Sequence, residues 1–339
     1  MKYHLQASLS RLSIASFLLL LSCLLPTAVF SDSDTKTHFS PNSPTFNLYA
    51  VKRIHGRRRT ASGSTRSYVL YIPQKSPSLP GPPYPLVVMV HGFLMSSNQQ
   101  GSTDLYIAQR GIAVLAPNMT RILLGSKNRT KNVIDVVDQT KWLVQQNKTS
   151  SSPYYGLIDP QRMGIAGNSS GGAVCFESAL EAQRIHIPFH SLCSMEGVPW
   201  DRTLGRVSQL EPTQILTLRA ESCLCNFHWN VLKYTKLLKF PTNDVKVNGA
   251  HHCDAENPTT VGCMSVCGIS HRKYRQLFKL ITYLYLRDTL KAPRVYNPSQ
   301  SFAEVMNDMQ RDGIVSAHLD NLQTSMLSSR ADFQPDALK

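Results

Sequence analysis

The sequence predicts an α/β fold in which helices flank a mostly parallel central sheet, and three observations predict it. Short β-rich runs alternate with helical patterns along the chain, which is typical of parallel strands joined by crossover helices. Residues 86–90 form a continuous apolar run, as expected of a strand buried on both faces. The chain has 339 residues, of which 42% are hydrophobic, so it can fill the core of one large domain of this kind.

Strands are expected where β-rich segments lie between turn residues: residues 45–52, 67–72, 86–90, 112–116, 163–167, 191–195, 215–218 and 244–247. The first two flank the basic stretch 55–59, which we interpret as a solvated hairpin turn, with a proteolytic processing site as the alternative. Helices are expected where apolar residues recur at helical spacing: residues 132–144, 173–184 and 274–290.

The amino terminus has the features of a secretory signal peptide. Lys2 and Arg11 precede an apolar run at residues 17–25, and the small residue Ser31 lies at a plausible cleavage point. A retained membrane anchor is the alternative, but the run is shorter than the roughly 20 residues that a span needs, and Pro26 interrupts the chain directly after it. We therefore expect a secreted protein.

These patterns also divide the chain. Residues 1–31 are the predicted signal peptide, and residues 32–44 are a polar amino-terminal segment. Residues 45–290 form one predicted catalytic domain, and residues 291–339 a short amphipathic helix with a polar tail. We find no internal repeat and expect a monomer.

Acceptor sequons and net charge bear on processing and partners. Sequons for N-glycosylation begin at Asn118, Asn128 and Asn147, which fits passage through a secretory pathway. The formal net charge of +14 predicts attraction to anionic surfaces. No zinc-finger, helix-turn-helix or base-stacking motif accompanies this charge, so we expect no nucleic-acid binding.

One serine lies in a motif typical of a catalytic nucleophile. Residues 167–171 match G-x-S-x-G, directly after the apolar strand at 163–167 and directly before a predicted helix. A sharp strand-to-helix turn would present the Ser169 hydroxyl at the sheet edge, beside a helix N-terminus that favours developing negative charge. A glycine-rich turn without catalysis, or a sequon at Asn168, is the alternative interpretation.

Acyl transfer also needs hydrogen-bond donors for the oxyanion. The first should be the backbone amide of Ser170, directly after the nucleophile. The second should be the amide of Phe93, because His91 and Gly92 end a central strand and Phe93 begins the next loop.

The order serine, acid, histidine predicts the other two members of a triad. Glu221 follows the strand at 215–218 and is the predicted acid, with Asp201 in reserve and a surface glutamate as the alternative for Glu221. His251 and His252 follow the last predicted strand. We favour His252 as the base, with His251 as the alternative.

Most cysteines are predicted to pair. Of the eight cysteines, Cys23 lies in the predicted signal peptide. The remaining number is odd, so at least one cysteine cannot pair within the chain. Cys175 is the expected free thiol because it lies in an apolar helical stretch. Five others crowd into the loops of the predicted acid and base, where disulfides would limit displacement of those groups: Cys223, Cys225, Cys253, Cys263 and Cys267. Zinc is the competing interpretation because histidines are interspersed, but the spacings match no recognised finger, so we expect no metal.

Three segments together resemble the dienelactone-hydrolase-like branch of the α/β hydrolases, with chlorophyllase-like enzymes and cutinase-like polyester hydrolases as its most similar members. They are Val90-His91-Gly92-Phe93, residues 159–172 and Gly249-Ala250-His251-His252, and the resemblance covers about residues 45–290. It implies the α/β-hydrolase fold, His252 as the base and Trp200 as a wall of the substrate pocket, although a plain core aromatic is the alternative for Trp200. The chain departs from the family at Asn168, where a histidine is common, and at Cys223, where the family's aspartate would fall.

The predicted function is that of a secreted serine hydrolase that cleaves carboxylic esters through an acyl-enzyme intermediate and needs no cofactor. The identity of the ester is not predicted. A non-catalytic binding protein on a hydrolase scaffold and a serine peptidase or amidase are the alternatives.

Overall fold

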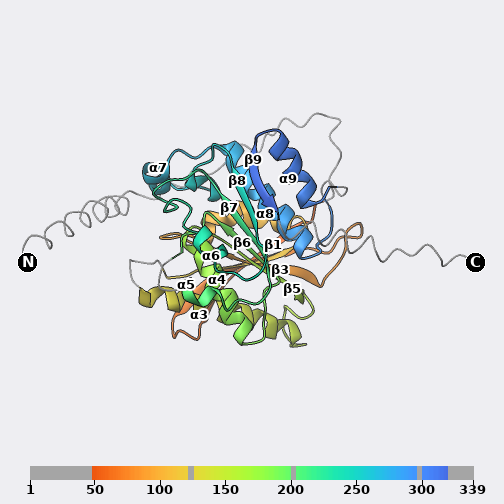
Figure 1. Ribbon diagram of the computed structural model, residues 1–339. Coiled ribbons are helices and arrows are strands. Elements are labelled where there is room, and N and C mark those ends of the chain that lie inside the picture. Colours follow the sequence, from red (N-terminus) through yellow and green to blue (C-terminus); the bar gives the residue numbers. More distant parts are fainter. Residues whose placement is uncertain (1–47, 121–125, 200–203, 296–299, 320–339) are drawn as a thin grey trace, which may run out of the picture.

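The computed structural model describes residues 48–120, 126–199, 204–295 and 300–319 (Figure 1). The predicted signal peptide, the reserve acid Asp201 and the predicted pocket residue Trp200 lie outside these residues. Within the described part of the chain, no helix is long and apolar enough to cross a membrane.

Among the described residues, nine strands form one sheet in the order β1-β2-β4-β3-β5-β6-β7-β8-β9. The strands from β3 to β8 run parallel to one another, while β1, β2 and β9 pair antiparallel at the two edges. The predicted α/β class is thereby confirmed. The bounds are β1 (Val51–Arg59), β2 (Thr65–Pro73), β3 (Tyr84–Val90), β4 (Ala113–Pro117), β5 (Ile158–Asn168), β6 (Ser191–Met195), β7 (Gln214–Arg219), β8 (Asn243–Val247) and β9 (Val315–Leu319).

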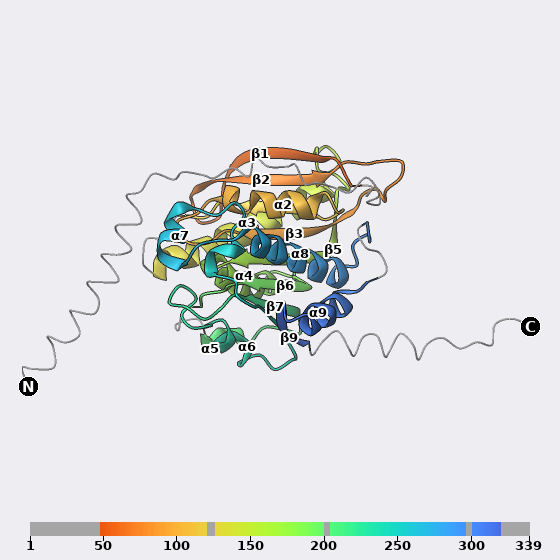
Figure 2. The same cartoon turned by 90° about the horizontal axis from the view of Figure 1, so that it is seen from above.

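Helices cover both faces of the sheet (Figures 1 and 2). On one face, apolar residues of α3 (Ser126–Lys148) and α4 (Ser170–Arg184) share a buried cluster with β3 and β5. On the other face, α2 (Gly101–Ala108), α8 (Arg272–Thr289) and α9 (Phe302–Arg311) share a second cluster. The shorter helices are η1 (Ser97–Gln100), α5 (Leu204–Val207), α6 (Leu232–Thr235), η3 (His252–Ala255) and α7 (Val261–Cys267).

The basic stretch 55–59 is a strand, so its interpretation as a turn was wrong. Arg57 and Arg59 pair with Ser67 and Thr65 of β2, and the turn lies at residues 60–64 instead. The arginines are tolerated because β1 is an edge strand, where alternate side chains face water and charge discourages pairing with another chain. Arg58 points the other way, pairs with Asp138 and lies over the Trp142 ring.

Candidate active site

Ser169 lies at the turn between β5 and α4 in a strained backbone conformation, with φ 55° and ψ −122°. Few non-glycine residues adopt such a conformation, and strain of this kind is concentrated at functional sites. The flanking glycines leave room for the turn. A Cβ on Gly171 would lie 2.4 Å from the carbonyl oxygens of Val90 and His91, and one on Gly167 would lie 2.8 Å from the Cys175 sulfur. The turn therefore requires glycine at positions 167 and 171, as in the G-x-S-x-G motif.

The imidazole of His252 lies against this hydroxyl. His252 begins η3, in the loop after β8, and its Nε2 atom is 3.0 Å from Ser169 Oγ. Its Nδ1 atom is 2.8 Å from Oε2 of Glu196, which directly follows β6. Since a carboxylate only accepts hydrogen bonds, Nδ1 carries the proton and Nε2 is left to accept one from the serine.

Glu196 is held from several sides. It is 1% exposed, its Oε1 atom accepts a hydrogen bond from the amide of Ala220, and Oε2 accepts one from Asn226 Nδ2 at 3.0 Å. Its own amide donates to the carbonyl of Leu218 at 2.7 Å, and its φ is 50°. A buried carboxylate with three hydrogen-bond donors around it, including the imidazole, is fixed in position.

Glu221, the predicted acid, is not at the site. Both of its carboxylate oxygens lie within hydrogen-bond distance of Lys246 Nζ, at 3.1 and 3.2 Å, and one accepts a hydrogen bond from the amide of Gly249. Its side chain is 40% exposed. The Gly249 amide is the largest of the causes that lower the pKa of Glu221. The prediction placed the acid one strand too far along the sheet, because Glu196 follows β6 and Glu221 follows β7.

A local signal for Glu196 was present in the sequence. It is the first residue after the apolar strand 191–195, and it precedes Gly197. An acid at the end of the strand beside the nucleophile's own strand is within reach of the same histidine, since neighbouring parallel strands end at one edge of the sheet. The ends of β6 and β7 are both plausible from sequence alone, and the choice between them depends on how far the histidine loop reaches back.

Of the two adjacent histidines, the structure places only His252 against Ser169. The His251 amide donates to Asp254, and its ring lies 6.2 Å from the ring of His271. A Cβ on Gly268 would lie 3.1 Å from the His251 ring. His251 therefore packs against the segment directly after α7.

The loop that was predicted to supply an oxyanion donor packs against the nucleophile turn. His91 fixes the end of β3, since its Nε2 accepts a hydrogen bond from the amide of Met119 at 2.9 Å. A Cβ on Gly92 would lie 3.4 Å from the Asn168 carbonyl oxygen. Phe93 is the next residue, and Ser170 is the first residue of α4. Both predicted donors thus lie on segments adjoining Ser169.

Two disulfides connect the loops of this region. Cys225–Cys267 joins the loop after β7 to α7, and Cys253–Cys263 joins the residue after His252 to the same helix. Cys175 is free and buried, as predicted, and Cys193 and Cys223 are also unpaired among the described cysteines. The loop that carries Asn226 and the loop that carries His252 are therefore tied to one short helix.

Two of the predicted glycosylation sites use their side chains in the fold. Asn147 is 8% exposed, its Nδ2 atom donates to the Ile158 carbonyl at 2.9 Å, and its Oδ1 atom accepts from the Ile158 amide at 2.8 Å. Asn118 accepts from the Ser97 amide and donates to Ser67. These amide groups are engaged in the fold, and at Asn147 a glycan would have to emerge from the interior. The side chain of Asn128 lies outside the described residues.

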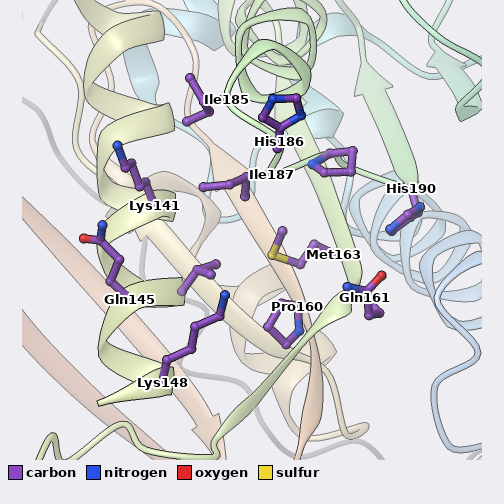
Figure 3. Close-up of a pocket in the computed structure, with 12 residues that line it drawn as sticks. Lys141, Gln145, Lys148, Pro160, Gln161, Met163, Ile185, His186, Ile187 and His190 are labelled. Carbon is purple, nitrogen blue, oxygen red and sulfur yellow. The ribbon is translucent and has the colours of Figure 1, made fainter.

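A cavity of about 360 Å³ lies at the opposite edge of the sheet (Figure 3). Pro160, Gln161 and Met163 line it from the beginning of β5, and Lys141 and Lys148 extend over it from α3. Ser169 follows the other end of the same strand. Parallel α/β sheets bind ligands beyond the carboxyl ends of their strands, which is where Ser169 lies. The cavity lies at the amino ends and is therefore separate from the candidate active site.

A serine on a strained strand-to-helix turn, hydrogen-bonded to an imidazole that is in turn hydrogen-bonded to a buried carboxylate, is the arrangement of serine hydrolases with the α/β-hydrolase fold. The chain belongs to the chlorophyllase family, whose family model matches residues 48–232. The matched segment includes Ser169 and Glu196 and ends before His252.

A curated relative supports this assignment. The chain is 26% identical over 138 residues to chlorophyllase type 0 from Chenopodium album. That alignment covers 38% of this chain and 40% of the relative. The chain thus matches less than half of the relative's length.

Proposed function

We propose that this protein hydrolyses carboxylic esters with Ser169 as nucleophile, His252 as general base and Glu196 as the residue that orients the histidine. The observation that carries the proposal is the continuous chain of hydrogen bonds from Ser169 Oγ through the His252 ring to Glu196, with heavy-atom distances of 3.0 and 2.8 Å. Both distances lie within the range for proton transfer between a nucleophile and its base.

The reaction follows from this geometry. His252 Nε2 takes the proton from Ser169 as Oγ attacks the ester carbonyl carbon, and the amides of Ser170 and Phe93 donate to the oxyanion. The imidazolium then protonates the leaving alcohol, which departs and leaves an acyl-serine. Water then attacks the acyl carbon as His252 takes its proton, and the imidazolium returns that proton to Ser169 Oγ as the acid is released. Glu196 stabilises the imidazolium and holds the tautomer with Nδ1 protonated.

Labelling by a fluorophosphonate tests this proposal, because the reagent reacts with activated serines. The native protein should label and should hydrolyse short-chain nitrophenyl esters, whereas Ser169→Ala should do neither. Ser170→Ala is the matched control, since Ser170 contributes a backbone amide that the substitution retains. Equal labelling of native protein and Ser169→Ala would contradict the proposal.

The substrate class is tested with a small panel of compounds. A nitrophenyl ester and the matching anilide separate an esterase from an amidase or peptidase, and we expect turnover of the ester alone. Since the relative is named a chlorophyllase, chlorophyll belongs in the panel. Binding of these compounds without turnover of any ester would favour a non-catalytic binding protein instead.

Secretion is part of the same proposal. It is supported by the apolar run at residues 17–25 and by the two disulfides, which are typical of oxidising compartments. Expression of the full chain in eukaryotic cells should release a protein whose amino terminus, determined by mass spectrometry, lies near residue 32. Retention of Met1 in a reduced intracellular protein would contradict it.

A further inference from the structure

Four large apolar side chains are exposed around one disulfide. The exposed fractions are 80% for Leu224, 64% for Phe227, 53% for Val266 and 68% for Ile269. Leu224 and Val266 each directly precede a cysteine of the Cys225–Cys267 bridge, and Phe227 and Ile269 each follow one by two residues. We call these four residues the apolar rim.

The disulfide brings the two segments of the rim together. The Cα atoms of Cys225 and Cys267 are 5.7 Å apart, so the four side chains, none more than two residues from that bridge, come from neighbouring segments. Single exposed apolar residues are ordinary on protein surfaces, whereas a group of them indicates an interaction site. The bridge also prevents the two segments from separating.

The rim adjoins the catalytic groups. Asn226, between Cys225 and Phe227, donates to Glu196. Cys253, next to His252, is bridged to Cys263 in α7, the helix that carries Val266. In Figures 1 and 2, α7 stands at one end of the molecule rather than over the middle of the sheet. The helix that carries Val266 therefore lies at the periphery of the domain.

The two segments that carry the rim are basic. Residues 222–235 and 257–275 contain no aspartate or glutamate, and the half-exposed carboxylate of Glu221, directly before the first segment, is paired with Lys246. Lys233, Arg272 and Lys273 lie in these segments and are exposed. An apolar patch flanked by cations matches the boundary of an anionic lipid bilayer, where apolar side chains enter the acyl region and basic side chains meet the headgroups.

We propose that the apolar rim inserts into anionic lipid bilayers and holds the protein with Ser169 beside the membrane surface. The inference concerns binding, and binding does not depend on the triad. Ser169→Ala should therefore bind vesicles as the native protein does, so that loss of catalysis and loss of docking are separate results.

Sedimentation with vesicles tests the proposal on the secreted chain. We expect binding to vesicles of phosphatidylcholine mixed with phosphatidylglycerol, weaker binding to phosphatidylcholine alone, and a decrease with salt. The double variant Leu224→Ser, Phe227→Ser should bind at least about tenfold more weakly, because each substitution removes a large apolar contact with the acyl region. Its thermal midpoint and its turnover of a soluble short-chain ester should be unchanged.

Tyr155→Ser is the matched control, since Tyr155 is 61% exposed and lies in the turn before β5, away from the rim. It should bind vesicles as the native protein does. Failure of the native protein to bind anionic vesicles, or equal binding by the double variant, would overturn the proposal. Self-association that the double variant abolishes, without binding to vesicles, would assign the rim to a second copy of the chain and would also overturn it.

Discussion

Replacing Glu196 by glutamine tests the assignment of the acid most sharply, because the shape of the side chain is kept while one acceptor becomes a donor. In the native protein the carboxylate accepts from three groups: the His252 ring, the Asn226 amide group and the backbone amide of Ala220. A glutamine has one acceptor oxygen, so its NH₂ group faces a donor in either orientation. If it faces His252, the ring turns to the tautomer with a proton on Nε2, and that atom no longer accepts the serine proton.

The expected loss of kcat follows from the role of Glu196 in fixing the tautomer of His252. A wrong tautomer in a serine triad lowers kcat by about 10⁴-fold, which corresponds to about 5.5 kcal/mol of transition-state stabilisation. Initial rates with a nitrophenyl ester measure it. Glu221→Gln is the matched control. It should change kcat by less than about threefold, because Glu221 is 40% exposed and pairs with Lys246 at the surface. A Glu196→Gln variant that keeps a tenth of the native kcat, or a larger loss in Glu221→Gln, would refute the reasoning.

Buried groups supply three further predictions. Asn226→Ala should lower kcat about tenfold with little change in KM, since it removes a hydrogen bond to the Glu196 carboxylate. Asn230→Ala, on the same loop, should leave kcat unchanged. Equal losses of kcat in the two variants would contradict a positioning role for Asn226. Burial raises the pKa of Glu256 from 4.5 to about 7. Between these pH values the folded chain holds a proton that the unfolded chain loses. The contribution of protonated Glu256 to stability is therefore complete below pH 4.5 and should be lost as pH rises through about 7. Denaturant titrations should show a steeper fall of stability with pH in the native protein than in Glu256→Gln, and identical slopes would contradict the prediction. Peptide mass mapping of the secreted protein should find Asn147 without a glycan, because this side chain is buried, and a glycan there would contradict its burial.

The sequence was sufficient for parts of the molecule whose signals are local. The strand-to-helix turn at Ser169 depends on glycines two residues to either side, and central strands such as 86–90 are recognisable because burial on both faces demands a continuous apolar run. His252 was favoured over His251 from a short resembling segment, and the structure places it against Ser169.

Features that depend on distant residues were missed. The acid was placed at Glu221 because it follows the strand 215–218 and lies between the serine and the histidine in the chain. Glu196, directly after β6, also lies between them, and only the path of the loop after β8 decides between the two. β9 was not expected, since its five residues expose Ser316 and His318 and are recognisable only by their pairing with β8. The arginine-rich stretch was interpreted as a turn because charge density indicates solvent exposure and does not distinguish a loop from an edge strand.

A crystal structure of the protein trapped with a phosphonate ester would test the roles of Ser169, His252 and Glu196 together. We expect a covalent bond from Ser169 Oγ to phosphorus, with the phosphonyl oxygen within about 3 Å of the Ser170 and Phe93 amides. We also expect His252 to remain hydrogen-bonded to Glu196. A phosphonate on another residue, or a Ser169 adduct with Glu221 rather than Glu196 against the His252 ring, would contradict these roles.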